Sequence, residues 1–300
     1  MKNVRIRYST LLWSGVMLVS LLLAGSRAYS ATNAQHSLWK VEGKKCAVYL
    51  AGSVHVLKAE NYPLPGEYEK AYSNAAILAF ETDIAAMEKM DTQMKLLSKA
   101  KLPDGETLAT QLSPATYAKF TNHLSTTELP AMVFEQLKPA MAALTLGVLE
   151  MQKLGYDPAF GLDKHFNGRA RKDEKPTVGL ETVDFQIDLI TGLSKEEGEL
   201  MMKITLEDIE KTKQEFGAMI KAWETGDNDG LEKVLNEATQ KAPAIFKRLL
   251  TDRNQRWVPK IQEWIQGDKN VLIVVGAGHL VGKEGVVELL RKQGLKVTQL

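Results

Sequence analysis

The sequence has almost no cysteine: Cys46 is the only one among its 300 residues. A single cysteine cannot form an internal disulfide, which excludes a small disulfide-stapled scaffold and leaves the hydrophobic core to stabilise the chain. Low-complexity stretches, tandem repeats and Pro/Gly/Ser-rich linkers are also missing after residue 30. Residues 31–300 are therefore expected to form one domain.

The first thirty residues have the pattern of an export signal. Lys2, Arg5 and Arg7 precede an apolar run at residues 11–24, and a stretch of small residues ends at Ser30. The run is shorter than the ~20 residues that span a bilayer, which argues against a membrane-spanning helix. A lipid anchor would need a cysteine at the cleavage point, but the only cysteine, Cys46, lies well inside the mature chain. We interpret residues 1–30 as a signal peptide cleaved after Ser30. The mature protein is then expected in the periplasm or outside the cell, without a membrane anchor.

An excess of basic charge is missing as well. The whole chain carries 38 Lys and Arg against 37 Asp and Glu, and the leader contains four of the basic residues and no acidic one. Its removal leaves 34 basic against 37 acidic residues, a formal charge of −3. This balance argues against a nucleic-acid partner.

Short apolar runs of strand length occur at four places in the mature chain. They are short and do not alternate with polar residues, which is typical of strands buried on both faces of a sheet. A fifth strand is expected at 295–299, after a helix at 285–293, in a βαβ-like arrangement. The four runs lie at residues 46–51, 76–80, 177–180 and 271–275.

Helical periodicity dominates the middle of the chain. One apolar face runs from Met202 to Trp223 and ends before Gly226, and another, around Trp257, begins after Thr251 or Asp252 as N-cap. The pattern predicts an α/β fold whose central sheet, mixed or mostly parallel, comes from the N- and C-terminal segments. Residues 31–300 would form this domain, with a large helical insertion at roughly 85–265.

The same short sequence motif follows two of the predicted strands. Gly52 begins a G-x-x-H motif that ends at His55, and Gly276 begins a second that ends at His279. Glycine at a strand exit lets the backbone turn sharply, so each histidine is expected over the carboxyl edge of the sheet. Two such motifs in a chain with five histidines favour one shared site.

Acidic residues follow the other two strands. Glu81 comes after Phe80, and Glu181 comes after Leu180. If the sheet is parallel, four strand exits deliver His55, Glu81, Glu181 and His279 to one edge. Two imidazoles with one or two carboxylates suit Zn²⁺, Mn²⁺ or Fe²⁺. A metal-activated water would need a general base, and spacing does not choose between Glu81 and Glu181.

Other polar residues carry weaker signals. Arg253 is expected in the first turn of its helix, where a cation is disfavoured, so an anionic partner such as Glu81 or a substrate carboxylate would explain it; a solvated arginine is the plainer alternative. Asp163 is interpreted as a first-turn helix acid. His165 is interpreted as a surface or core-edge histidine, and Ser53 lacks the elbow motif of a nucleophile.

Together these pieces resemble the TraB/GumN family, which includes the PrgY pheromone-shutdown proteins and the TIKI metalloproteases. The resemblance implies a fold akin to erythromycin esterases and ChaN-like haem-binding proteins, with a site containing His55, Glu81 and His279 and supported by Arg253. The sequence ends a few residues after its last predicted strand and shows no C-terminal membrane segment of the TIKI and TraB pattern, so the expected likeness is to the exported bacterial GumN-like members. The matching pieces are Leu50-Ala51-Gly52-Ser53-Val54-His55 with Leu64-Pro65, Phe80-Glu81-Thr82-Asp83, Gly161-Leu162-Asp163, Leu180-Glu181-Thr182, Arg253-Asn254 with Trp257, and Val275-Gly276-Ala277-Gly278-His279-Leu280.

The combined expectation is a divalent-metal-dependent hydrolase, with peptidase activity inherited by analogy. His55, His279 and Glu81 are the expected metal ligands, the ion is Mn²⁺, Co²⁺ or Zn²⁺, and Glu81, Glu181 and Arg253 are the expected catalytic residues. The substrate would be a peptide or a small molecule. Two alternatives stand beside this: a metal-dependent esterase, and a binding protein that sequesters a peptide, haem or a polysaccharide precursor without turnover.

Overall fold

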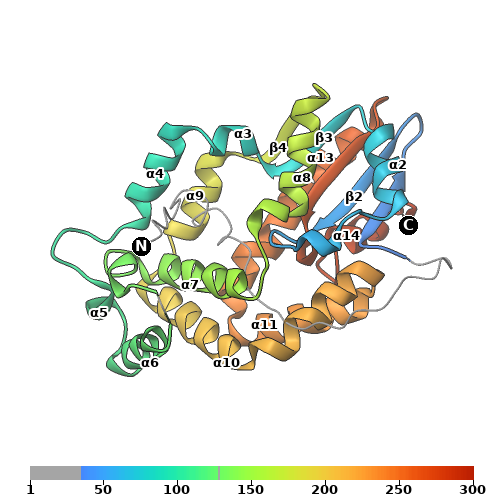
Figure 1. Cartoon of the computed structure of the whole chain (residues 1–300). Helices are drawn as coiled ribbons and strands as arrows, with labels where there is room; N and C mark the ends of the chain where they lie inside the picture. Colours follow the sequence, from blue (N-terminus) through green and yellow to red (C-terminus); the bar gives the residue numbers. More distant parts are fainter. Residues whose placement is uncertain (1–34, 128) are drawn as a thin grey trace.

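A six-stranded sheet forms the centre of the protein. The computed structural model describes residues 35–127 and 129–300 (Figure 1). The strand order is β4-β3-β5-β2-β1-β6, and the four strands from β4 to β2 are mutually parallel. The mostly parallel α/β fold expected from the sequence is thereby confirmed. The strands are β1 (Leu38–Glu42), β2 (Ala47–Ser53), β3 (Ile77–Thr82), β4 (Thr177–Glu181), β5 (Val271–Gly276) and β6 (Val297–Gln299).

The strands depart from the sequence-based expectation mainly at β1 and β2, while β3 and β4 run on to Thr82 and Glu181 and β6 begins only at Val297. Strand β1 was not expected; it pairs antiparallel with both β2 and β6. Lys40 and Glu42 interrupt its apolar residues, so it lacks the unbroken run that marks β2 and β5. Strand β2 begins at Ala47 and runs on to Ser53, so Cys46 lies just before the strand.

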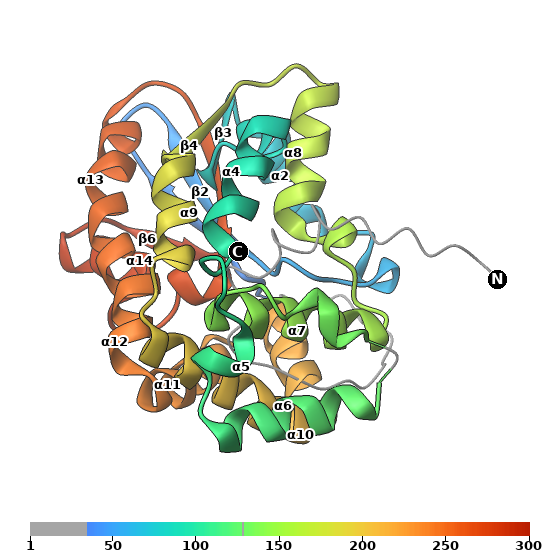
Figure 2. The ribbon, with the colours of Figure 1, turned by 90° about the vertical axis from the view of Figure 1, so that its left-hand side faces the viewer.

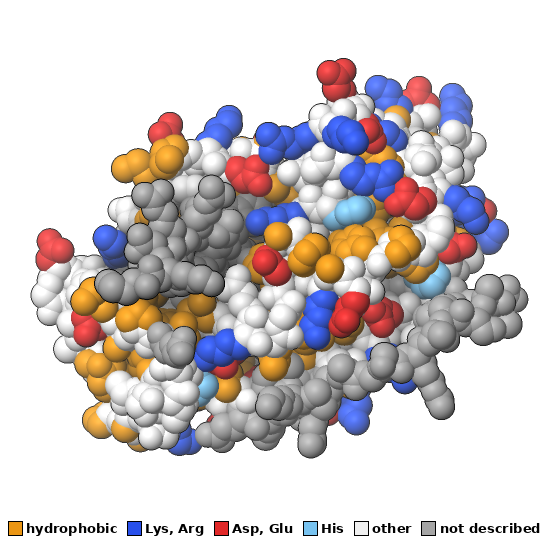
Figure 3. Space-filling model, in the orientation of Figure 1, with side chains coloured by type: hydrophobic (Ala, Val, Ile, Leu, Met, Phe, Trp, Pro, Cys, Tyr) orange, Lys and Arg blue, Asp and Glu red, His pale blue; other side chains and the backbone are white. Residues whose placement is uncertain are grey.

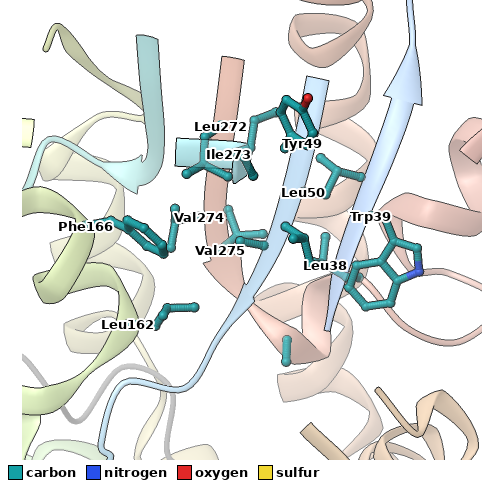
Figure 4. Close-up of a cluster of buried hydrophobic side chains, with 14 of the residues drawn as sticks. Leu38, Trp39, Tyr49, Leu50, Leu162, Phe166, Leu272, Ile273, Val274 and Val275 are labelled. Atoms are coloured by element: carbon teal, nitrogen blue, oxygen red, sulfur yellow. The ribbon is translucent and has the colours of Figure 1, made fainter. Parts of the chain in front are cut away.

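Helices cover both faces of the parallel strands. Figure 2 shows α2 (Gly66–Asn74) and α8 (Leu162–Lys172) on one side, and α13 (Asp252–Gln266) with α14 (Val286–Lys292) on the other. In Figure 4, Leu162 and Phe166 of α8 face β5 near Val274. This two-sided cover explains why β2 and β5 are buried along their whole length.

A second cluster of buried side chains lies among the helices of the middle segment. Helices α7 and α10 pack along each other, and α10 ends at Gly226 in the left-handed conformation (φ 62°), as its sequence pattern predicts. None of the described helices is long and apolar enough to cross a membrane. The remaining helices are α3 (Ile84–Met87), α4 (Met90–Ala100), α5 (Leu108–Gln111), α6 (Pro114–Ser125), α7 (Pro139–Lys153), α9 (Val183–Thr191), α10 (Lys195–Thr225), α11 (Asn228–Lys241) and α12 (Pro243–Phe246), with 3₁₀ turns η2 (Ala59–Asn61), η3 (Ala131–Val133), η4 (Pro158–Phe160) and η6 (Ala277–His279).

The start of α13 differs from the expected helix cap. Thr251 has helical backbone angles (φ −58°, ψ −49°) and its side chain caps nothing. A π-helical turn, η5 (Lys247–Thr251), instead joins α12 to α13. Arg253 therefore does not lie at a free helix N-terminus, and the expectation of an unfavourable helix dipole at this residue was wrong.

The surface and the N-terminus add two further observations. On the face drawn in Figure 3, acidic and basic side chains of the described residues are interspersed rather than gathered by sign. The signal peptide expected at residues 1–30 lies outside the described residues.

Candidate functional site

Four neighbouring parallel strands end at the same edge of the sheet. Their order, β4-β3-β5-β2, aligns Glu181, Glu81, His279 and His55 in that sequence along the carboxyl edge. The register pairs Thr82 with Glu181 and Ser53 with Gly276, so the strand ends are level with one another. The structure thus brings together the four strand-exit residues that the sequence singled out.

Arg253, which is 1% exposed, lies at the centre of this group. Its Nε and Nη2 donate to Glu181 Oε2 at 2.9 and 2.8 Å, and Nη2 also donates to Glu81 Oε2 at 2.6 Å. Its Nη1 donates to the Leu249 carbonyl at 3.1 Å and to His279 Nε2 at 3.0 Å. These contacts use all five N–H groups of the guanidinium. Glu81 is therefore a partner of Arg253, and the solvated-arginine interpretation was wrong.

Glu81 is a buried carboxylate held in its ionised form. Its Oε1 accepts from the Gly276 N–H at 2.9 Å, and its Oε2 accepts from Gln186 at 3.3 Å as well as from Arg253. Burial alone would raise the pKa of Glu81, but the positive charge of Arg253 outweighs this and lowers the pKa to about 2. A carboxylate with so low a pKa is a weak proton acceptor near neutral pH.

His279 is a neutral, fully buried imidazole. Asn254 Nδ2 donates to the Glu284 carbonyl at 2.8 Å, which directs Asn254 Oδ1 toward His279 Nδ1 at 2.6 Å. Nδ1 then carries the proton, and Nε2 accepts from Arg253. Burial and the nearby positive charge of Arg253 lower the pKa of His279 to about 3.

His55 is the partly exposed member of the group, with 22% of its side chain accessible. Its Nδ1 lies 2.8 Å from Asp163 Oδ1, which also accepts a hydrogen bond from Ser53 Oγ at 2.9 Å. Its Nε2 has no hydrogen-bond partner and lies 4.0 Å from Glu81 Oε1. Burial lowers the pKa of His55, but the charge and hydrogen bond of Asp163 more than offset this, so its pKa is raised.

Gly161 allows α8 to approach the His55 turn closely. A Cβ at this position would lie 2.4 Å from the His55 carbonyl oxygen, and the next residue, Leu162, donates its N–H to Val54 at 3.2 Å. This close approach brings Asp163, in the first turn of α8, within reach of the imidazole. Asp163 is a first-turn acid as expected, and it also holds His55.

We expect Gly161→Ala to lower the free energy of unfolding by about 1–3 kcal/mol, because the added methyl group must push α8 off the His55 backbone. Urea denaturation measures this directly. Gly168→Ala, in the same helix, is the control: a Cβ there meets nothing within 4 Å, so the change should raise stability by up to about 1 kcal/mol. Equal effects of the two substitutions would contradict the close-approach explanation.

The arrangement of the described side chains does not fit a metal ion as it stands. Arg253 takes the Nε2 lone pair of His279 and one oxygen of Glu81, which leaves His55 Nε2 and Glu81 Oε1 as the available donors. Among the residues that the structure describes, no three His, Cys, Asp or Glu side chains are placed to hold a metal together. The expected ligation by His55, His279 and Glu81 stays a prediction.

Several residues of this group were not found from the sequence. Asp163 was interpreted only as a first-turn helix acid, although it belongs to the Gly161-Leu162-Asp163 piece that carries the family resemblance. Asn254, which orients His279, follows Arg253 directly and was likewise part of the resemblance. Gln186, which donates to Glu81 and to Glu181 at 3.3 and 3.4 Å, comes from α9 and carries no recognisable sequence signal.

Comparison with known proteins identifies the family. A model of the TraB/PrgY/gumN family matches residues 37–299. The chain is 24% identical over 243 residues to the uncharacterized protein YbaP of Escherichia coli K12 and, at the same identity, to YbaP of Shigella flexneri; the match covers 81% of this chain and 87% of either relative. No solved structure matches the chain. The family match spans nearly all of the described residues and includes every member of the site, and the chain belongs to the TraB/PrgY/gumN family.

Proposed function

We propose that this protein is a hydrolase in which His55 is the general base. The observation that supports this assignment is the environment of the imidazole. One nitrogen is fixed by Asp163 at 2.8 Å, whereas the other, Nε2, has no partner and lies 4.0 Å from a carboxylate oxygen of Glu81. A carboxylate that orients a histidine whose second nitrogen is free is a common arrangement for abstracting a proton from a nucleophile.

The proposal places the attacking water beside His55 Nε2 and Glu81 Oε1, because two acceptors 4.0 Å apart both lie within hydrogen-bond reach of one water. In the proposed reaction, water gives a proton to Nε2 while its oxygen attacks the carbonyl carbon of the substrate. The bond from that carbon to the leaving nitrogen or oxygen then breaks, and His55 returns the proton to the leaving group. The products are a carboxylic acid and an amine or alcohol.

The two candidate bases from the sequence receive other roles in this proposal. Both oxygens of Glu181 are bonded to Arg253 and one is also bonded to Gln186, so Glu181 holds the guanidinium. Glu81 keeps one oxygen directed at the water position, and its lowered pKa keeps it an acceptor that orients the water. We therefore assign the proton transfer to His55, because its pKa is raised from 6.5 whereas the pKa of Glu81 is lowered to about 2.

The substrate class follows from the chemistry of the site and from the family analogy. A base-activated water cleaves peptides and esters alike, and the resemblance to TIKI proteins favours peptides. The test is a quenched-fluorescence peptide library beside a panel of aryl and alkyl esters, using residues 31–300. Turnover of peptides alone would support a peptidase and turnover of esters alone an esterase. Saturable binding without product would replace the hydrolase proposal by the binding-protein alternative.

The pH dependence of hydrolysis tests the role of His55. A general base must be neutral, so kcat/KM should rise with pH through the pKa of His55, which lies above its ordinary value of 6.5. Asp163→Asn removes the negative charge that raises this pKa, so the rising limb should move to lower pH and the plateau should fall. Ser53→Ala leaves the charge in place and should move the limb less. A limb that stays in place in Asp163→Asn would contradict the assignment.

A further inference from the structure

We propose that the guanidinium of Arg253 is the resident cation of this site and occupies the position that a divalent metal would take. The inference rests on the proposed function in one respect, because it concerns how that hydrolysis proceeds: the reaction would not depend on a metal held by these residues. It replaces the metal-bound arrangement expected from the sequence by an arrangement in which the protein supplies the positive charge itself.

The acceptors around Arg253 are of the types that bind metal ions, but in the described residues they are spaced around the guanidinium and not placed to hold one ion together. They are one oxygen of Glu81 at 2.6 Å, one oxygen of Glu181 at 2.8 Å and the Nε2 atom of His279 at 3.0 Å. Two carboxylates and an imidazole are ligands that Zn²⁺ and Mn²⁺ share in many proteins. Here each of them directs a lone pair at a nitrogen of the guanidinium. A metal ion would have to compete for the same lone pairs.

Further contacts fix the guanidinium of Arg253 in this position. The π-helical turn before α13 presents the Leu249 carbonyl to Nη1 at 3.1 Å, and the guanidinium carbon lies 4.8 Å from the centre of the Trp257 ring. The side chain is 1% exposed and has no N–H group left for solvent. Displacing it would leave two buried carboxylates without their cation.

A metal beside Arg253 is disfavoured by charge. His55 Nε2 and Glu81 Oε1 remain as donors, but Glu81 is the same carboxylate that binds the guanidinium through its other oxygen. An ion there would lie within a few ångströms of a fixed positive charge in a buried environment, where repulsion is strong. Removal of Arg253 would remove this repulsion. It would also leave His279, Glu81 and Glu181 around a space without a cation, which favours the binding of a metal ion.

The experiment compares metal binding by wild type and by Arg253→Ala. Both proteins are stripped with EDTA, reloaded with Co²⁺ or Zn²⁺ and dialysed, and metal content, Co²⁺ absorption in the visible range and melting temperature are measured. Wild type is expected to retain well below one ion per chain and to melt at the same temperature with and without metal. Arg253→Ala should bind close to one ion and gain several degrees in Tm, and Arg253→Ala/His279→Ala should lose both effects.

Two results would overturn the proposal. One is near-stoichiometric metal in wild type that disappears in His279→Ala, since metal and Arg253 would then coexist. The other is Arg253→Ala that binds no metal. If Arg253→Ala does not fold without metal, it is refolded in the presence of Co²⁺ before its metal content is measured. The metal content of the wild type tests the resident-cation proposal independently of this variant. Lack of turnover by wild type on every substrate would remove the hydrolase proposal without changing the metal result, whereas turnover abolished by EDTA and restored by Zn²⁺ would overturn the resident-cation proposal alone.

Discussion

His55→Gln is expected to lower kcat/KM about 10²–10⁴-fold on any substrate that the wild-type protein hydrolyses, the usual contribution of a general base. Glutamine can still donate a hydrogen bond to Asp163, so the turn after β2 should keep its shape. It cannot accept a proton from water at neutral pH, which removes the proposed chemical step. Steady-state kinetics with the peptide or ester found by the substrate panels would measure the loss.

His123→Gln is the matched control for this substitution. His123 also pairs with a carboxylate, the partly buried Glu150, 3.0 Å from its Nε2, and its side chain is 20% exposed compared with 22% for His55. It lies in α6, away from the edge of the sheet where the site is built. His123→Gln should keep the wild-type rate. A similar loss in both variants, or a wild-type rate in His55→Gln, would show that His55 is not the base.

The central strands were predictable because burial on both faces of the sheet leaves a direct mark on their sequences. Strands buried on both faces need unbroken apolar residues, and the runs at β2 and β5 satisfy this over their full length. The antiparallel strand β1 was missed for the converse reason, since Lys40 and Glu42 alternate with its buried residues. The parallel direction of the four strands then follows from helical crossovers, which are the usual connection between parallel strands, whereas their order in the sheet is seen only in the structure.

The candidate site was predictable only where the strands fix it. The carboxyl ends of parallel strands lie at one edge of the sheet, so His55, Glu81, Glu181 and His279 could be grouped on the assumption of a parallel sheet, which the structure bears out. Residues from the covering helices could not be assigned to the site in this way. The rotation of a helix and its distance from the sheet depend on packing, which sequence spacing does not report. Asp163 reaches His55 only because Gly161 permits a close approach.

Arg253 illustrates how a partner can be identified for the wrong reason. The expected cause was an unfavourable helix dipole, but the helix continues backward through a π-helical turn. The actual cause is two buried carboxylates, Glu81 and Glu181, that need a cation. A π-helical turn has no clear sequence signature, and such turns occur often at functional sites because they redirect side chains.

Arg253→Met is expected to lower the free energy of unfolding by about 3–5 kcal/mol, a larger loss of stability than Gly161→Ala should cause. Methionine fills much of the same volume but leaves Glu81 and Glu181 as buried carboxylates without a cation. Arg171→Met is the control, because the pair of Arg171 with Glu88 is exposed and such pairs contribute about 0–1 kcal/mol. Urea denaturation near pH 7 with EDTA present measures both.

A double-mutant cycle separates the charge effect from the loss of packing. If unpaired carboxylates cause the destabilisation, Arg253→Met should cost less in a Glu81→Gln background, because one of the two buried negative charges is already neutral. If lost packing against Trp257 were the cause, the cost would be the same in both backgrounds. The same cycle bears on the resident-cation proposal: a strong coupling between Arg253 and Glu81 means that the site requires a positive charge at this position, and equal costs would mean that it does not.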